Sequence, residues 1–121
     1  MTDVTADSPK PIGPYTPVVR AGDWLICSGQ LGVRDGALVE GVAAQVTQAV
    51  ANMTTLLAGV GAELTAVAKT TVFLADIADF AAMNEAYVAA FGDHRPARSA
   101  FAVAALPLGA LVEIEAWAYA G

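Results

Sequence analysis

Apolar side chains alternate with polar ones, or repeat at helical spacing, along most of the chain, and these patterns predict its secondary structure. The most regular segment is 111–119, in which Glu113, Glu115 and Trp117 share one face and smaller apolar residues occupy the other. β-Branched, aromatic and other apolar residues predict four further strands, at 18–20, 24–29, 66–74 and 97–105.

The first two of these strands form a predicted hairpin, because Gly22 and Asp23 supply a turn between them. Alternation along 24–29 places Ser28 on one face and Gly29, with Cys27, on the other. A second tight turn is expected at 34–37, where Asp and Gly are adjacent.

The stretch 42–62 contains no charged residue and is long enough to cross a bilayer. Its apolar residues repeat at helical spacing, however, and leave a second, polar face. The side chains of that polar face are Gln45, Gln48, Asn52 and Thr55. We therefore expect an amphipathic helix that packs on a core and ends near Gly59 or Gly61, and no membrane span.

A second helix is predicted from Asp79, a favourable N-cap residue, to Gly92. Its apolar residues at helical spacing are Phe80, Met83, Tyr87 and Phe91. The resulting order, ββαβαββ, predicts an α+β fold of two layers with both helices on one face of a mixed sheet. The other face is also rich in apolar residues, so we expect a second chain to cover it.

Composition supports this expectation and excludes some classes of protein. The chain has 121 residues, of which 56% are hydrophobic and 15% charged, and we expect one domain over 1–121 with a polar extension at 1–10. The net charge is −6 and the six basic residues are scattered, which disfavours nucleic acid as a partner. Cys27 is the single cysteine and 1–9 is not typical of an export signal, so we expect a cytoplasmic protein.

Few residues are candidates for chemistry. One His and one Cys far apart make a metal site improbable, and the glycines match no nucleotide-binding motif. We interpret Cys27 as a buried structural thiol rather than a nucleophile, and His94 as a solvated loop residue. Arg98, with Glu113 or Glu115 in the next predicted strand, is more informative, since acids inside a strand face solvent, a partner charge or a site. The residues alone leave a structural salt bridge, an exposed edge and catalysis open.

Several short motifs occur together, in order, over nearly the whole chain. They are Pro11-Ile-Gly-Pro-Tyr15, Ser28-Gly-Gln30, Lys69-Thr-Thr-Val-Phe73, Asp79-Phe80, Asn84 to Tyr87, Pro96-Ala-Arg-Ser99 and Val112-Glu-Ile-Glu-Ala116. With these motifs the chain resembles the Rid family, the RidA/YjgF reactive-intermediate deaminases. The resemblance implies a chorismate-mutase-like fold assembled as a homotrimer, with a cleft between each pair of subunits. It also implies hydrolysis of enamines and imines, such as 2-aminoacrylate and 2-iminopropionate, to 2-keto acids and ammonia without a cofactor.

The resemblance also implies roles for individual residues. Arg98 would hold the substrate carboxylate, and Glu113 would orient or activate the attacking water. Tyr15, Ser28 and Asn84 would line the cleft from a neighbouring subunit. Gly29 and Ala100 would complete the substrate-binding positions.

Ala100 departs from many members of the family, which carry Cys at this position. A thiol-dependent mechanism is therefore excluded, and we expect the change to affect the shape of the pocket or the range of substrates. The connection 92–95 also looks short beside familiar members. The alternative is a non-catalytic trimer of the same fold that binds a small carboxylate or a partner protein, or that has a regulatory role. The acidic balance argues against ribonuclease activity.

Overall fold

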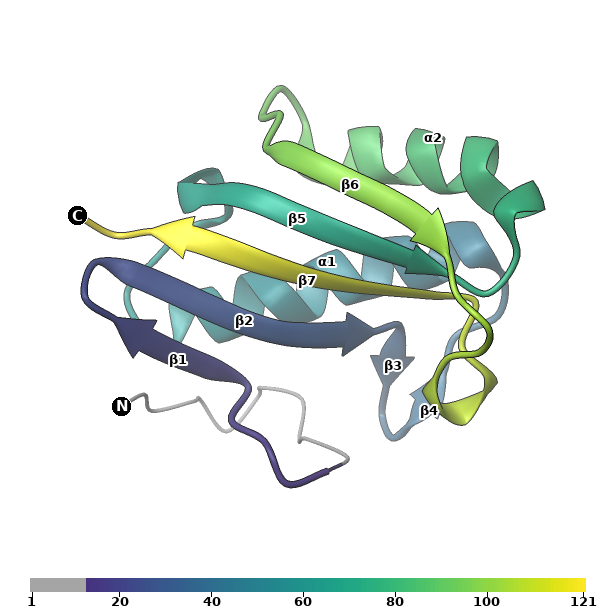
Figure 1. The fold of residues 1–121 in the computed structure, drawn as a ribbon, viewed down its shortest axis with the longest axis horizontal. Coiled ribbons are helices and arrows are strands. Elements are labelled where there is room, and N and C mark those ends of the chain that lie inside the picture. The colour runs from purple at the N-terminus through teal and green to yellow at the C-terminus, as the bar shows by residue number, and fades with distance from the viewer. Residues whose placement is uncertain (1–12) are drawn as a thin grey trace.

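The computed structural model describes residues 13–121, which form a sheet covered on one face by two helices (Figure 1). The sheet contains β1 (Val18–Ala21), β2 (Trp24–Leu31), β5 (Val67–Leu74), β6 (Ala97–Ala102) and β7 (Val112–Tyr119). The helices are α1 (Val42–Ala58) and α2 (Phe80–Phe91), and a small ribbon is made by β3 (Val33–Arg34) and β4 (Ala37–Leu38). Single 3-10 turns occur at η1 (Leu64–Ala66), η2 (Ile77–Asp79) and η3 (Pro107–Gly109). The polar extension expected at 1–10 lies outside the described residues.

The strand order in the sheet is β1-β2-β7-β5-β6. β5 and β6 are parallel and are joined through α2, while the other neighbouring strands are antiparallel. Both helices lie behind the sheet in Figure 1. The α+β class, the two layers, the mixed sheet and the order ββαβαββ are therefore confirmed.

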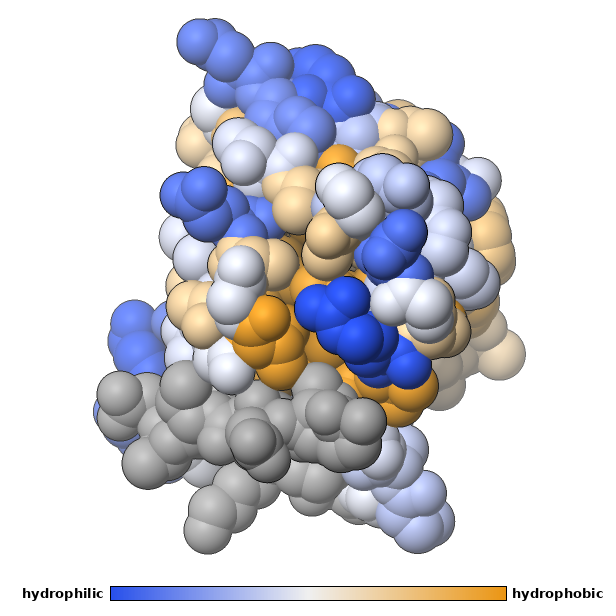
Figure 2. Space-filling model, turned by 90° about the vertical axis from the view of Figure 1, so that its left-hand side faces the viewer, coloured by the Kyte–Doolittle hydropathy of each residue, from blue (hydrophilic) through white to orange (hydrophobic). Residues whose placement is uncertain are grey.

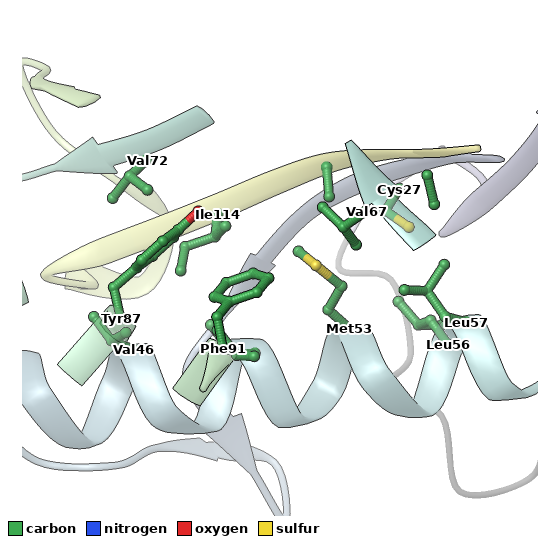
Figure 3. Packing of buried hydrophobic residues seen from close by; sticks show 14 of the residues in the cluster. Cys27, Val46, Met53, Leu56, Leu57, Val67, Val72, Tyr87, Phe91 and Ile114 are labelled. Atoms are coloured by element: carbon green, nitrogen blue, oxygen red, sulfur yellow. The ribbon is translucent and has the colours of Figure 1, made fainter. Parts of the chain in front are cut away.

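The core lies between the helices and the inner face of the sheet. Figure 3 shows side chains of α1 and α2 directed toward the strands, among them Met53, Leu57, Tyr87 and Phe91. Alternate residues of β7 complete this core from the sheet side: Val112, Ile114, Ala116 and Ala118. Burial of these apolar side chains is the main favourable contribution to folding.

The polar face predicted for the first helix is partly wrong, because Gln45 and Asn52 are buried. Gln45 accepts a hydrogen bond from the Leu111 backbone N–H at 2.9 Å and donates one to the Val39 carbonyl at 3.0 Å. Asn52 donates to the carbonyls of Leu31 and Val33. Buried amides are stable here because they satisfy backbone groups that leave the sheet at this end. No helix of the described residues is long and apolar enough to cross a membrane.

Several boundaries differ from the prediction. Asp79 precedes α2 but its side chain makes no capping hydrogen bond; the Asp76 side chain instead accepts one from the Ala78 N–H in the preceding 3-10 turn. β6 ends at Ala102 rather than at residue 105. The turn expected at 34–37 is confirmed and joins the two short strands of the ribbon.

The outer face of the sheet carries exposed aromatic side chains. Trp24 lies edge-on to Trp117 and to Tyr119, with ring centroids 6.0 and 5.1 Å apart, and the two β7 residues are 43% and 49% exposed. Phe73 and Phe101 form a second edge-on pair farther along this face. At the end of the molecule where the C-terminus lies, hydrophobic residues gather between hydrophilic ones (Figure 2). Exposed aromatic side chains on a sheet face, as on this outer face, are typical of a protein that packs against a partner.

Candidate active site

A hollow of about 250 Å³ opens beside β2 and β7 and is lined by residues distant in sequence. Its lining residues are Tyr15, Ser28, Gly29, Pro107 and Glu113. Four of them are predicted site residues, so the structure brings Tyr15, Ser28, Gly29 and Glu113 together.

A bulge in β2 shapes this hollow. Cys27 pairs with Ala116 and Gln30 pairs with Ile114, so Ser28 and Gly29 together lie opposite one residue of β7. A β-carbon built on Gly29 would lie 2.7 Å from the carboxyl carbon of Glu113. Gly29 therefore faces the hollow, and the prediction that it shares the face of Cys27 is wrong, because the bulge interrupts strict alternation.

The carboxyl group of Glu113 occupies the space that a side chain at position 29 would fill. Burial raises the pKa of Glu113, and the neighbouring carboxylate of Glu115 raises it further. A carboxyl group whose pKa lies above its ordinary value exchanges protons near neutral pH more readily than an ordinary glutamate. Glu113 is thus suited to general acid–base chemistry.

The part of the hollow formed by Ser28 is held by hydrogen bonds to the preceding segment of the chain. The Ser28 hydroxyl donates a hydrogen bond to the Thr16 carbonyl at 2.7 Å, and the Ser28 N–H donates to the Pro17 carbonyl at 2.9 Å. These bonds fix the segment that carries Tyr15, whose side chain is exposed at the rim. Because the hydroxyl proton of Ser28 is donated to Thr16, the Ser28 oxygen interacts with any other group as a hydrogen-bond acceptor.

Arg98 lies in a different environment, on the helix-covered face of the edge strand β6. Its Nη1 lies 3.8 Å from the sulfur of Met83, and its guanidinium carbon lies 4.9 Å from the centre of the Tyr87 ring and 5.7 Å from that of Phe80. Within residues 13–121, no carboxylate forms a salt bridge with this half-buried guanidinium. Its N–H donors therefore remain available to an anion.

Two more predicted site residues lie on this side of the molecule. Asn84 follows Met83 in α2, and its Oδ1 is buried with no hydrogen-bond partner among the described residues. Ala100 is two residues beyond Arg98 in β6, where it packs against the core beside Val72. An unsatisfied buried amide oxygen is unfavourable unless a ligand or water donates to it.

The structure does not bring Arg98 and Glu113 together within one chain. β5 lies between β6 and β7, so these are not neighbouring strands. Arg98 pairs with the buried Thr70, whereas Glu113 pairs with Phe73 on the outer face. An intrachain salt bridge between Arg98 and Glu113, one interpretation left open by the sequence, is therefore wrong.

The remaining candidates differ in outcome. Cys27 is buried, as predicted, and burial raises the pKa of its thiol to about 12, which makes it a poor nucleophile. His94 is not simply solvated, since its Nε2 lies 2.7 Å from the Val67 carbonyl and its ring contacts Phe91. Among residues 13–121, no group of three His, Cys, Asp or Glu side chains is placed to hold a metal ion.

Some residues around Glu113 and around Arg98 were not identified as site residues from the sequence. Pro107 lines the hollow but lies in an irregular segment without a periodic pattern. Phe80, Met83 and Tyr87 were predicted as helix core, yet they also surround Arg98. The helical spacing of these residues in α2 is enough to predict that they are buried. It does not show that Arg98 lies against them, because that contact depends on the pairing of β6 with β5.

Known proteins resemble this chain in sequence and in fold. A family model described as Endoribonuclease L-PSP matches residues 5–120. The human 2-iminobutanoate/2-iminopropanoate deaminase is 47% identical over 120 residues, covering 97% of this chain and 88% of the human protein. The crystal structure of the Escherichia coli YjgF gene product superimposes with a TM-score of 0.92 at 40% identity, covering 98% of each chain. That of E. coli TdcF with bound serine gives 0.92 at 33% identity, covering 100% of this chain and 98% of TdcF.

The chain belongs to the YjgF/RidA family, and the resemblance seen in the sequence motifs is confirmed. Two relatives that are 47% and 46% identical to this chain are named 2-iminobutanoate/2-iminopropanoate deaminases.

Proposed function

We propose that this protein hydrolyses 2-imino acids and their enamine tautomers, of the 2-iminopropionate and 2-aminoacrylate type, to 2-keto acids and ammonia. The observation that carries this proposal is the division of the candidate residues into an acid–base half around Glu113 and an anion-binding half around Arg98. Names of relatives support it, since the human relative is named for the 2-imino acids that it deaminates.

The chemistry required of the Glu113 half is limited. Water adds to the C=N carbon of the imine, the nitrogen gains protons, and the C–N bond then breaks as the carbonyl forms and ammonia leaves. Glu113 accepts a proton from the attacking water and returns it to the departing nitrogen. The Ser28 oxygen and the Tyr15 side chain line the same space and orient the reacting group.

The Arg98 half supplies substrate binding. A guanidinium binds a carboxylate through two parallel N–H···O bonds, and no carboxylate among residues 13–121 pairs with the guanidinium of Arg98. The buried oxygen of Asn84 accepts no hydrogen bond from the described residues and suits an N–H of the imine or of the tetrahedral intermediate. The related TdcF has been crystallised with serine, an amino acid that carries a carboxylate next to a nitrogen-bearing carbon.

We further propose that the active protein is a homotrimer with sites between subunits. The exposed aromatic residues of the outer sheet face would be covered by neighbouring copies. Since Arg98 and Glu113 lie on opposite faces of one chain, a site that uses both is most simply built from two copies.

A direct assay tests the proposed reaction. An amino-acid oxidase or a lyase that depends on pyridoxal phosphate generates the imino acid in place, and release of 2-keto acid is followed with and without the protein. Acceleration by the wild-type protein but not by Arg98→Ala is expected. Binding of 2-keto acids without any acceleration would replace the enzyme with a non-catalytic carboxylate-binding protein. A salt-sensitive complex with RNA would favour ribonuclease activity instead, which the net charge of −6 opposes.

A further inference from the structure

Within the part of the chain that the structure describes, the guanidinium of Arg98 lies over aromatic side chains and pairs with no acid. Its carbon is 4.9 Å from the centre of the Tyr87 ring and 5.7 Å from that of Phe80, within the range of cation–π contacts. The third neighbour is the polarisable sulfur of Met83. All three come from one face of α2, so this helix provides the surface on which Arg98 rests.

Of the three side chains that contact Arg98, Tyr87 is fixed by both a hydrogen bond and a ring contact. Its hydroxyl lies 2.7 Å from Oγ1 of Thr70 in β5, and its ring lies 4.6 Å from that of Phe91 on the side of the core. The side chain is 3% exposed, and its oxygen is directed toward the strands (Figure 3). Burial raises the pKa of Tyr87, so the ring is a neutral phenol rather than an anion that would bind Arg98 as a salt bridge.

Register places Thr70 directly beside Arg98. The two residues are partners in the parallel pairing of β5 with β6, so both point to the helix-covered face. Thr70 thus fixes Tyr87 by a hydrogen bond and lies next to the residue that Tyr87 supports. The three side chains form one unit across β5, β6 and α2.

We propose that Tyr87, anchored by Thr70, is a positioning residue that holds the Arg98 guanidinium in the orientation that receives the substrate carboxylate. This inference rests on the proposed function, because it assigns Arg98 its role there. An arginine side chain loses rotational freedom when it binds an anion, and a preformed stack removes part of that loss before binding. The aromatic surface does this without neutralising the charge, which a carboxylate partner would do.

The test compares substitutions that alter the surface in graded ways. Tyr87→Phe keeps the ring and loses the bond to Thr70, Tyr87→Leu removes the ring, and Phe80→Leu removes the second ring, which is half-buried. Phe91→Leu is the matched control, because Phe91 stacks on the far side of Tyr87 and has a similar burial but no contact with Arg98. We expect the Kd for pyruvate and the KM for 2-iminopropionate to rise about 3- to 30-fold in Tyr87→Leu, less in Phe80→Leu and in Tyr87→Phe, and less than about 2-fold in Phe91→Leu. kcat should change less than KM, because these substitutions affect substrate binding by Arg98 and leave Glu113, which activates the water, unchanged.

A second measurement is independent of activity. Nuclear magnetic resonance relaxation of the Arg98 Nε–H group reports how rigidly the guanidinium is held. We expect an ordered group in the wild-type protein and in Phe91→Leu, and a mobile one in Tyr87→Leu and Phe80→Leu. If Tyr87→Leu does not fold, Phe80→Leu provides the same comparison at a half-buried position.

The outcomes separate this inference from the proposed function. A wild-type protein that deaminates imines, with Arg98 equally ordered and pyruvate equally well bound in every variant, overturns the positioning role and leaves the reaction intact. An ordered Arg98 that becomes mobile in Tyr87→Leu, in a protein that turns over no imine, sustains the stacking and overturns the reaction. Equal losses in Tyr87→Leu and Phe91→Leu show only a general effect on the core and also overturn the positioning role.

Discussion

Gly29 and Glu113 share one space: the Glu113 carboxyl group lies where a side chain at position 29 would be. A β-carbon there would come within 2.7 Å of the carboxyl carbon, well inside ordinary van der Waals contact. The bulge in β2 turns this glycine toward the hollow. The position of the proposed acid–base group therefore depends on the absence of a side chain on the neighbouring strand.

Gly29→Ala should displace the Glu113 carboxyl group by about 1 Å and lower kcat by about 10- to 100-fold, because catalytic groups are sensitive to such shifts. Steady-state kinetics measures the loss. Gly36→Ala is the control, since a β-carbon there meets nothing and the cost is local backbone strain in the ribbon. Equal activity of Gly29→Ala and the wild-type protein would contradict the proposed role of Glu113.

Arg98→Ala and Glu113→Gln should fail in different ways. Without the guanidinium, both binding of 2-keto acids and turnover should be lost, because the partner of the carboxylate is gone. Glu113→Gln should keep binding nearly intact and lose about 100-fold or more in kcat. Calorimetric titration with pyruvate, together with kinetics, separates the two. Normal turnover by Arg98→Ala, or a fully active Glu113→Gln beside an inactive Glu115→Gln, would show that the roles are misassigned.

The fold was predictable to a greater extent than the site. Helical spacing in 42–62 and alternation in 111–119 are properties of consecutive residues, so they are visible in the sequence and both elements are confirmed. The burial of Gln45 was not predictable in this way, because its partners, Val39 and Leu111, depend on how distant segments meet. The bulge at Ser28 and Gly29 likewise arises from pairing with β7 rather than from local pattern.

The pH dependence of the reaction should follow Glu113. Burial first, and then the charge of Glu115, raises the pKa of Glu113, so the activity that needs its carboxylate should increase with pH through this raised value. Glu115→Gln should lower the pKa of Glu113 and move this increase to lower pH, though not fully to the ordinary value, because burial remains. Profiles of kcat/KM against pH measure the shift. Glu63→Gln, which removes an exposed charge elsewhere, should leave the profile unchanged.

The same shift affects stability with a definite sign. The folded protein binds the Glu113 proton more tightly than the unfolded chain, so the contribution of this group is fully present below its ordinary pKa and is lost as the pH rises through the raised value. Glu113→Gln should therefore raise the free energy of unfolding near neutral pH and leave it almost unchanged in acid. Urea denaturation at several pH values tests this, and a destabilised Glu113→Gln at neutral pH would contradict it.

Cys27 should be dispensable for turnover. Its thiol is buried, with a pKa raised to about 12. Cys27→Ala should keep kcat and KM but lower the free energy of unfolding by about 1 to 3 kcal/mol through the cavity that it leaves. In the native wild-type protein, iodoacetamide should react with Cys27 only slowly, as mass spectrometry can follow. Loss of turnover in a folded Cys27→Ala would reverse this interpretation.

The spatial grouping of the site residues could not be predicted from the sequence pattern. The motifs indicated Arg98 and Glu113, but not that β5 separates their strands or that they occupy opposite faces. The resemblance implied that Tyr15, Ser28 and Asn84 line the cleft from one neighbouring subunit. In the structure Tyr15 and Ser28 lie with Glu113, whereas Asn84 follows the residue that contacts Arg98. Such arrangements depend on strand order, which consecutive residues do not encode.

Mixed assemblies test whether the two halves of a site come from different copies. Arg98→Ala chains keep Glu113, and Glu113→Gln chains keep Arg98, so neither homotrimer has an intact site. In trimers assembled from equal amounts of both, a site that combines Arg98 of one copy with Glu113 of another should be intact in about one case in four, restoring about a quarter of wild-type turnover. A site built within one chain would remain inactive in every mixture. Sedimentation measures assembly in parallel, and a stable monomer near 12.3 kDa would exclude a shared site altogether.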